Sequence, residues 1–212
     1  MFGNHAGFNL LDGLMLTVGA RLHSKSARHV RALFHIGSEK APLFGPFLMN
    51  QLGAVIGHQQ NIHYLLGKGE VVLTYPEGGK STSKPYDKRR ALCPPEEFGD
   101  GFIKAAIQSK VPLIPVATVG CEEALPTMFI SEPLGKFFGF DQGKYPVTPQ
   151  SFFTVPHSLM GVPLHCFNFL LGFPSKVRIK VGEPVSVSKN DDVASLKQKL
   201  YDRLQSMILE LA

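Results

Sequence analysis

The chain has 212 residues, a formal net charge of +5 and an isoelectric point near 9.1. This length suits one domain with a sizeable core, and an apolar content of 44% excludes an intrinsically disordered chain. The positive charge favours an anionic partner, such as a phosphorylated small molecule, an acidic membrane or nucleic acid. The three cysteines lie far apart, so we expect reduced thiols in an intracellular compartment and no metal site.

The first part of the chain alternates helix-like and strand-like apolar runs. Residues 10–22 predict a helix, and residues 70–75 form the clearest buried strand. Between them we expect four further elements: a strand at 30–34, a kinked helix at 42–52, a short buried strand at 53–57 and a helix at 61–66.

A polar, basic loop at residues 81–95 separates these elements from the rest. After it we expect a helix at 99–110, a buried strand at 111–119, a late strand at 176–187 and an amphipathic helix at 191–211. Pro112 and Pro115 argue against a central, fully paired position for the 111–119 strand. The inner stripe of the last helix consists of apolar residues at helical spacing: Val193, Leu196, Leu200, Leu204 and Ile208.

Strands that alternate with helices predict an α/β fold with a largely parallel central sheet flanked by helices. No internal repeat and no linker interrupts the sequence, so we predict a single domain over residues 1–212. The chain starts without a basic-then-apolar signal segment. Met1 and Phe2 look like the end of a strand with nothing ahead to support it, so we expect that an N-terminal membrane-anchoring segment is missing.

The segment between Tyr145 and Ser175 has no Asp, Glu, Lys or Arg, but it has five phenylalanines. Its five prolines argue against a straight membrane-spanning helix. Two interpretations stay open: a long loop buried over the core, or an apolar surface for a membrane or an acyl chain. In the second interpretation the most apolar run contains Phe167, Phe169 and the leucines that follow.

A glycine-punctuated turn holds His5, and Asp12 follows at the head of the first predicted helix. An imidazole titrates near neutral pH, and it can take a proton from a hydroxyl when a neighbour fixes its tautomer. Asp12 is the only acid before Glu39, so no other nearby carboxylate can orient His5. The alternative is a structural role, in which Asn9 caps the helix and Asp12 completes the cap. The two roles are compatible.

The loop at residues 76–81 follows the clearest predicted strand, so it emerges at the carboxyl end of that strand. Ligands of open α/β sheets bind at this edge. Gly78 and Gly79 allow backbone amides to approach an anion, and Lys80 supplies positive charge.

A nucleotide phosphate loop also ends in Gly-Lys-Ser, but this loop does not fit that motif. Thr74 stands where the motif requires its first glycine, and Pro85 obstructs the helix that should follow Ser81. We therefore exclude a nucleotide phosphate loop.

Four short motifs occur in the order seen in the glycerolipid (lysophospholipid) acyltransferase superfamily. They are Asn4-His5 with Gly7 and Asp12, Gly-Ala-Val-Ile-Gly-His at 53–58, Tyr-Pro-Glu-Gly at 75–78, and Val-Pro-Leu-Ile-Pro-Val at 111–116. The chain resembles the 1-acylglycerol-3-phosphate acyltransferase-like proteins, above all their bacterial glycerol-acyltransferase-like and diacylglycerol-acyltransferase-like branch. That branch also has Ser-Lys-Pro, here at 83–85, and Val-Gly-x-Glu-Glu, here at 119–123. The resemblance covers residues 4 to about 187.

The resemblance implies a glycerol-3-phosphate acyltransferase-like fold and a catalytic pair of His5 and Asp12. It also places the substrate-binding loop of the family on this chain. The expected substrate-binding residues are Glu77, Gly78, Gly79, Lys80, Ser81 and Lys84.

The sequence departs from the family pattern in three places. Asp12 lies two residues beyond the common His-x-x-x-x-Asp spacing, a longer form that the bacterial branch shares. Gly79 replaces a threonine, and Lys80 replaces an arginine that binds phosphate in a bidentate manner. The arginine of the second motif has no clear counterpart near His58. Both a phosphorylated acceptor and an uncharged glyceride or alcohol therefore stay open.

The resemblance implies direct acyl transfer to a hydroxyl of a glycerolipid, with acyl-CoA or acyl carrier protein as co-substrate, no cofactor and no metal. No acyl-enzyme is expected, and the chain has no Gly-x-Ser-x-Gly nucleophile elbow. We expect a membrane-associated protein on the cytoplasmic face, in contact with lipid through the 145–175 segment and basic residues. Nucleic acid is not an expected partner, because aromatic residues do not interleave with the basic loop.

Two other functions fit the same residues. One is a lipid esterase or thioesterase, in which His5 activates water instead of an acceptor hydroxyl. The other is a non-catalytic lipid-binding remnant of a larger enzyme.

Overall fold

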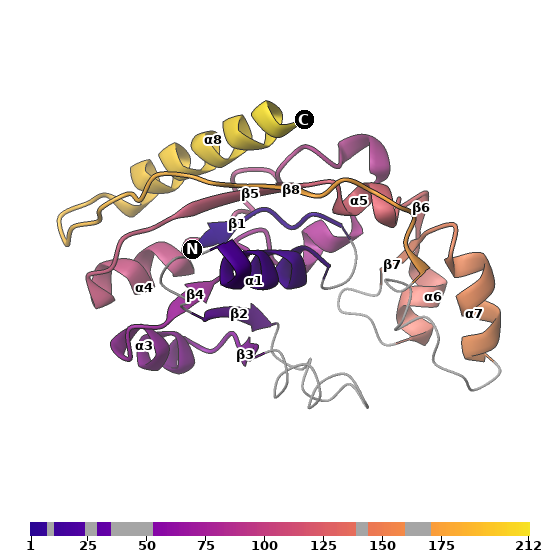
Figure 1. The fold of residues 1–212 in the computed structure, drawn as a ribbon, viewed down its shortest axis with the longest axis horizontal. Helices are drawn as coiled ribbons and strands as arrows, with labels where there is room; N and C mark the ends of the chain where they lie inside the picture. The colour runs from indigo at the N-terminus through magenta and orange to yellow at the C-terminus, as the bar shows by residue number, and fades with distance from the viewer. Residues whose placement is uncertain (8–10, 24–28, 35–52, 139–143, 160–170) are drawn as a thin grey trace.

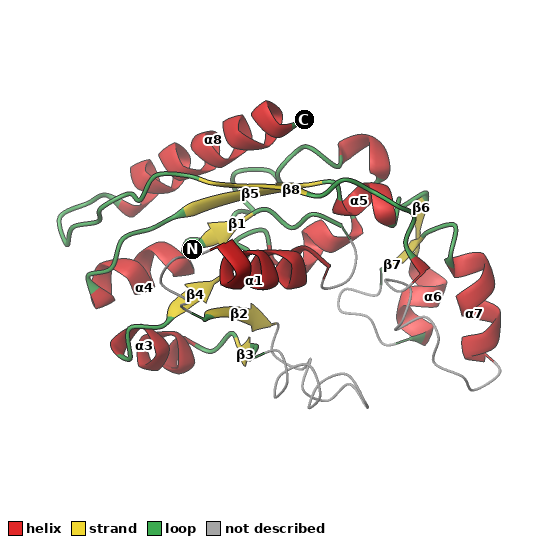
Figure 2. Cartoon of the chain, in the orientation of Figure 1, coloured by secondary structure: helices red, strands yellow, loops and turns green. Residues whose placement is uncertain are grey.

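The computed structural model of the protein describes residues 1–7, 11–23, 29–34, 53–138, 144–159 and 171–212. Strands and helices alternate along these ranges (Figure 1, Figure 2). In chain order they are β1 (Phe2–Gly3), α1 (Leu11–His23), β2 (Val30–Phe34), β3 (Val55–Ile56), α3 (Gln59–Gly67), β4 (Val71–Leu73), η2 (Gly78–Ser83), η3 (Tyr86–Lys88), α4 (Gly101–Ser109), β5 (Pro115–Val119), α5 (Cys121–Ala124), β6 (Phe129–Ser131), α6 (Glu132–Phe137), β7 (Tyr145–Val147), α7 (Ser151–Leu159), β8 (Arg178–Val181) and α8 (Val193–Leu211).

The central sheet joins two three-stranded sheets, β3-β2-β4 and β1-β5-β8. A parallel bridge between Phe2 and Thr74 connects them, with backbone bonds from Gly3 N to Thr74 O (3.0 Å) and from Thr74 N to Met1 O (3.1 Å). The strand order is therefore β3-β2-β4-β1-β5-β8, and only the β5–β8 pairing is antiparallel. These pairings confirm the predicted α/β class with a largely parallel sheet.

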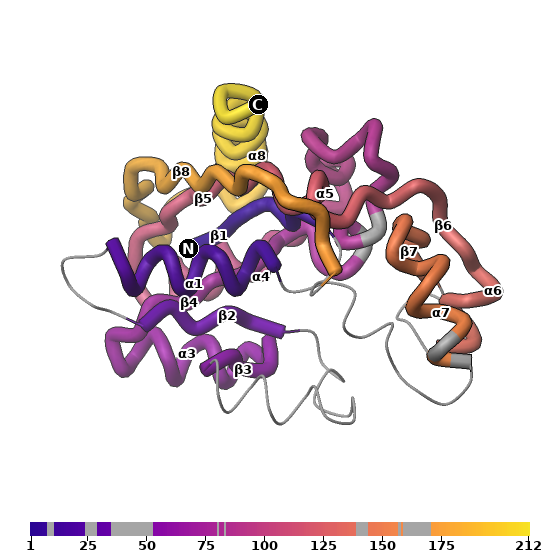
Figure 3. The backbone as a smooth tube through the Cα atoms, turned by 45° about the vertical axis from the view of Figure 1, so that its right-hand side comes forward, coloured from indigo at the N-terminus to yellow at the C-terminus, as the bar shows by residue number. Residues whose placement is uncertain are grey.

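Helices cover both faces of this sheet (Figure 1, Figure 3). On one face, Leu16 of α1 packs against Val30, Leu73 and Val116. On the other face, α4 and α8 pack over a larger core, to which Phe2 contributes. Successive strand residues point to opposite faces, which is why the neighbouring residues Val116 and Ala117 of β5 belong to different clusters.

The C-terminal helix α8 forms as the sequence predicts. Asp192 caps its first turn, because the carboxylate accepts hydrogen bonds from the N–H groups of Ala194 and Ser195. On its inner side Leu200 and Leu204 are fully buried. The predicted apolar stripe is therefore the face that contacts the sheet.

The 111–119 strand departs from the prediction, because β5 is the middle strand of β1-β5-β8. Pro112 precedes the strand. Pro115 is its first residue and belongs to the ladder, opposite Phe2, and its carbonyl accepts the Gly182 N–H at 2.8 Å. The neighbouring strand bonds to the residue before Pro115, through Phe2 N and Ile114 O at 2.9 Å. A proline at the first position of a strand costs no ladder bond there, so the predicted non-central position is wrong.

Other boundaries also shift. The predicted loop at 81–95 contains η3 and the end of η2, and the predicted buried strand at 53–57 shortens to β3, which is half-buried at the sheet edge. The late strand shortens to β8, followed by a separate bridge between Leu113 and Val185. The helix predicted at 42–52 lies outside the described residues.

A small antiparallel pair, β6 and β7, lies with α6 and α7 at one end of the molecule (Figure 1). Tyr145, Val147 and Val155 form a buried cluster there. Within the ranges that the structure describes, no helix is both long and apolar enough to cross a membrane.

Gly120, which joins β5 to α5, is expected to tolerate no side chain. Its φ is +104°, and a Cβ would lie 2.2 Å from the Lys176 carbonyl oxygen. We expect Gly120→Ala to lower the free energy of unfolding by about 3 kcal/mol in urea titrations, from backbone strain plus overpacking. Gly19→Ala in α1 is the matched control, since its Cβ meets nothing within 4 Å, and it should raise stability by about 0.5–1 kcal/mol. Equal effects of the two changes would contradict this account.

Candidate active site

Three neighbouring parallel strands end at the same edge of the sheet. His5 follows β1, the 75–84 loop follows β4, and Glu122 follows β5. β1 is also the strand at which the topology changes direction, because the chain runs from β1 to β2 on one side and later reaches β5 on the other. Such a switch point at the carboxyl ends of strands is where α/β sheets bind ligands.

His5 and Asp12 form a close pair at this edge. The His5 Nδ1 atom lies 2.8 Å from Asp12 Oδ2, with the imidazole 19% exposed and the carboxylate 1% exposed. A buried carboxylate at Nδ1 stabilises the tautomer with its proton on Nδ1. Nε2 then keeps its lone pair, and no hydrogen bond from Nε2 is found within the described part of the chain. The structure thus brings the two predicted residues together, and their catalytic role stays a prediction.

Asp12 also holds the turn that leads into α1. Its oxygens accept hydrogen bonds from Ala6 N at 3.1 Å and from its neighbour Gly13 N at 2.7 Å. A negative charge at the start of a helix is favoured by the helix dipole. Structural and orienting roles therefore coexist in Asp12, whereas the predicted cap residue Asn9 lies outside the described residues.

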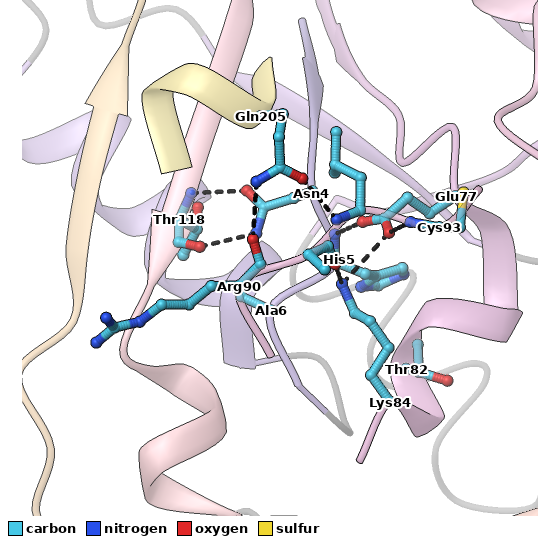
Figure 4. Close-up of polar contacts among 12 residues, drawn as sticks. Asn4, His5, Ala6, Glu77, Thr82, Lys84, Arg90, Cys93, Thr118 and Gln205 are labelled. Carbon is cyan, nitrogen blue, oxygen red and sulfur yellow. Dashed lines mark hydrogen bonds and ion pairs between the residues drawn. The ribbon is translucent and has the colours of Figure 1, made fainter. Parts of the chain in front are cut away.

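Buried hydrogen bonds fix the backbone on both sides of His5 (Figure 4). Asn4, 2% exposed, donates its side-chain amide to Thr118 O and accepts from Thr118 N, both at 2.8 Å. Glu77 accepts the His5 N–H at 2.9 Å through Oε1. Through Oε2 it accepts Cys93 N–H at 2.8 Å and the Lys84 ammonium at 3.3 Å. Both oxygens of Glu77 are therefore occupied by groups of the chain, which gives this predicted substrate-binding residue a positioning role.

Tyr75 stacks on the imidazole of His5, with ring centroids 4.1 Å apart and planes at 15°. Burial, and then the nearby charge of Asp12, raise the pKa of Tyr75 well above its usual value, so the phenol stays neutral. The stack covers one face of the imidazole and so restrains the orientation of its ring. The sequence placed Tyr75 at the end of a strand and at the start of the Tyr-Pro-Glu-Gly motif, but it did not predict the contact with His5, because stacking between residues 70 apart leaves no local pattern.

The predicted substrate-binding residues begin with Glu77, the residue immediately before η2. Gly78 has a φ of +63°, a conformation that glycine adopts without strain, and both it and Gly79 are exposed. Ser81 is 2% exposed, and its hydroxyl has no hydrogen-bond partner in the described part of the chain. The side chain of Lys80 lies outside the described part of the structure, so its predicted contact with substrate stays a prediction.

Two of the four cations of the basic loop, Lys84 and Arg89, pair with acids of the chain. Lys84 pairs with Glu77 and donates to Ala91 O at 2.9 Å. Arg89 pairs with Glu123 at 3.2 Å and lies over the ring of Tyr86, 4.0 Å from its centroid. Lys84 was predicted to bind substrate, but its ammonium contacts the carboxylate that holds His5.

Glu122 is a buried acid that the sequence connected only to the family resemblance. It is 7% exposed, and a Cβ on Gly7 would lie 3.3 Å from its backbone nitrogen. The pKa of Glu122 is raised to about 7, mainly by burial and to a smaller extent by the charges of Glu123 and Asp12, while a backbone hydrogen bond and Lys84 act in the opposite direction. Its place after β5, at the same edge as His5, is the signal that could have identified it.

The two described cysteines are buried and lie near the same carboxylates. Burial and then Glu77 raise the pKa of Cys93 to about 11. Burial and then Asp12 raise the pKa of Cys121 well above its usual value. Both are thiols at neutral pH, and the thiolate is the nucleophilic form, so neither is equipped to form an acyl-enzyme.

A protein-family model described as Acyltransferase matches residues 1–119, which is more than half of the chain. The chain belongs to the acyltransferase family. The matched region contains β1 to β5, and with them both His5 and the loop that holds it.

Relatives of this acyltransferase-family chain occur among mycobacterial proteins. It is 33% identical over 183 residues to uncharacterized proteins of Mycobacterium tuberculosis (strain ATCC 25618 / H37Rv) and Mycobacterium bovis, covering 86% of this chain and 46% of each relative. An uncharacterized protein of Mycobacterium leprae is equally similar, with 45% of its length covered. The chain thus spans about half the length of these curated relatives. No solved structure matches it.

The raised pKa of Glu122 predicts a pH-dependent stability. Between about pH 5 and 7 the folded chain holds a proton that the unfolded chain has released, so the free energy of unfolding falls as pH rises through this window. A shift from 4.5 to about 7 corresponds to about 3 kcal/mol. We expect Glu122→Gln to remove this loss. In urea titrations the free energy of unfolding of the wild type should fall between pH 5 and pH 8, whereas that of the variant should change by less. Glu132→Gln, at an exposed position, should follow the wild type, and parallel curves for all three proteins would contradict the prediction.

Proposed function

We propose that this chain is an O-acyltransferase domain that moves a fatty acyl group from acyl-CoA or acyl carrier protein to a hydroxyl of a glycerolipid or related alcohol. The observation that supports it most is the His5–Asp12 pair at the carboxyl ends of β1, β4 and β5, with no hydrogen bond from His5 Nε2 to any of the described residues. The family match supports acyl transfer as the reaction class.

In the proposed reaction, His5 Nε2 takes the proton of the acceptor hydroxyl as the oxygen attacks the thioester carbonyl. Asp12 stabilises the imidazolium that forms, and the stack with Tyr75 restrains the orientation of its ring. When the tetrahedral intermediate collapses, the carbon–sulfur bond breaks. The leaving thiolate then takes the proton from His5, so the base returns to its starting state and no cofactor is needed.

The charges around the pair bear on the choice of acceptor. Asp12, Glu77 and Glu122 are buried carboxyl groups near His5, and Lys84 is already paired with one of them. A phosphorylated acceptor would need another cation, and in the loop that cation is Lys80. If Lys80 does not contact the acceptor, an uncharged glyceride or alcohol fits this edge better than a phosphorylated one.

We further propose peripheral contact with a membrane on the cytoplasmic face through the 145–175 segment. Among its described residues, Phe152, Phe153 and Phe173 are each at least half exposed, and burial of such rings in lipid contributes roughly 1.5–3 kcal/mol each. The run with Phe167 and Phe169 lies outside the described residues. Co-sedimentation with vesicles, wild type against Phe152→Ser, measures this contact.

The catalytic pair is tested by acyl transfer from a radiolabelled donor. We expect His5→Ala to lower kcat about 10²–10⁴-fold, the contribution of a general base, and Asp12→Asn to lower it about 10²-fold or more, because the tautomer is lost. His63→Ala is the matched control, since His63 bonds Ser109 between α3 and α4, and it should keep full activity. If Asp12→Asn kept full turnover and showed only a lower melting temperature, Asp12 would have a structural role at the start of α1 and no role in catalysis. Free fatty acid as the sole product would identify a hydrolase.

We expect Lys80 to bind the phosphate of an anionic acceptor. Lys80→Ala should raise KM for a phosphorylated acceptor about tenfold, the loss of one charge-assisted hydrogen bond, with little effect on KM for the acyl donor. Lys80→Arg should restore binding, and Lys88→Ala, at an exposed position in η3, should leave both constants unchanged. Equal changes for phosphorylated and neutral acceptors would show that Lys80 does not contact the phosphate.

A further inference from the structure

Helix α1 has apolar side chains on its outer face. Met15, Val18 and Leu22 are 40%, 46% and 74% exposed. Their spacing of three and four residues places them on one side of a helix. The opposite side already packs on the sheet through Leu16.

No polar side chain interrupts this face over nearly two turns. Asp12 is buried, and the hydroxyl of Thr17 is satisfied inside the helix, by the carbonyls of Gly13 and Leu14 at 2.9 and 3.0 Å. A helix that is apolar all round is normally covered on every side. Helix α8 shows the ordinary pattern of this fold, because its outer side is polar and carries Leu209 as a single exposed leucine.

The charges beside this face have one sign. Arg21 and His23 are exposed in the last turn of α1, and the exposed His29 follows in the described chain. Between Asp12 and Glu39 the sequence has four Lys or Arg residues and no acid. An apolar face with basic residues beside it, and with no exposed carboxylate among the described residues of α1, is complementary to a lipid leaflet that contains anionic headgroups.

We propose that the outer face of α1 (Met15, Val18 and Leu22 with Arg21) docks on an anionic lipid leaflet. Asp12 is the second residue of α1, so docking of this helix would place the proposed catalytic pair close to the lipid headgroups. The protein would then take its acceptor from the leaflet rather than from water, a conclusion that rests on the proposed acyl transfer, whereas the docking itself does not. This face is separate in sequence from the 145–175 segment.

Vesicle co-sedimentation without any acyl donor tests the proposal. The vesicles are phosphatidylcholine, with or without phosphatidylglycerol, and the two variants are Leu22→Asp and Leu209→Asp. Both leucines are exposed and lie near the C-terminus of their helix, so an unfavourable charge–dipole effect is common to both. Circular dichroism checks that both stay folded.

We expect Leu22→Asp to lower partition onto phosphatidylglycerol vesicles about 10-fold to 100-fold, the loss of one buried leucine, and Leu209→Asp to bind as the wild type does. Arg21→Glu should weaken binding to the anionic vesicles only. Equal binding of Leu22→Asp and the wild type, or no wild-type binding, would overturn the proposal. A wild-type dimer that Leu22→Asp converts to monomer, with vesicle binding unchanged, would assign the face to a second copy instead.

The outcome is independent of the catalytic assay. His5→Ala protein should bind vesicles as the wild type does, because His5 lies outside the docking face. If acyl transfer is never detected but Leu22→Asp still loses vesicle binding, the docking surface stands and the proposed reaction fails. If acyl transfer to a water-soluble acceptor is normal and Leu22→Asp binds vesicles as the wild type does, the proposed reaction is supported and the proposed docking surface is wrong.

Discussion

The candidate site depends on one buried carboxylate, that of Glu77. An ionised group in the interior is costly unless donors surround it, and here a backbone N–H from the His5 turn, a second from Cys93 and the Lys84 ammonium supply them. His5 lies 72 residues from Glu77 in the sequence, whereas Lys84 and Cys93 follow Glu77 by 7 and 16 residues. The carboxylate therefore fixes the backbone of the base to the loop that follows β4, and the two shift together or not at all.

The other polar side chains at this edge of the sheet also make more than one contact each. Asn4 satisfies both backbone groups of Thr118, and Asp12 satisfies two N–H groups while it orients the imidazole. Each polar side chain thus serves the turn and the chemistry at once. Preorganisation of this kind lets a general base act without rearrangement of its surroundings.

What the sequence could predict follows from the range of the interactions. His5 and Asp12 are seven residues apart and of distinctive chemistry, so the pair was visible, as were β4 and α8 through their apolar periodicity. Two of the three hydrogen bonds that Glu77 accepts come from backbone N–H groups, which every residue except proline has, so no residue pattern marked them. Tyr75 stacks on His5 and Glu122 lies beside Gly7 because β4 and β5 flank β1 in the sheet, a proximity that no local sequence pattern shows. The central position of β5 was misjudged because a proline count ignores where in the strand each proline falls.

The position of β1 sets the order in which the protein can be completed. Its two residues lie between β4 and β5, and Asn4 bonds to a residue 114 positions later. Pairing over such separations is slow to form, because loop closure precedes the contacts that reward it. During synthesis β1 must wait until β5 has followed it out of the ribosome. His5 is thus translated well before β5, but its backbone is held in place only once β5 has paired with β1.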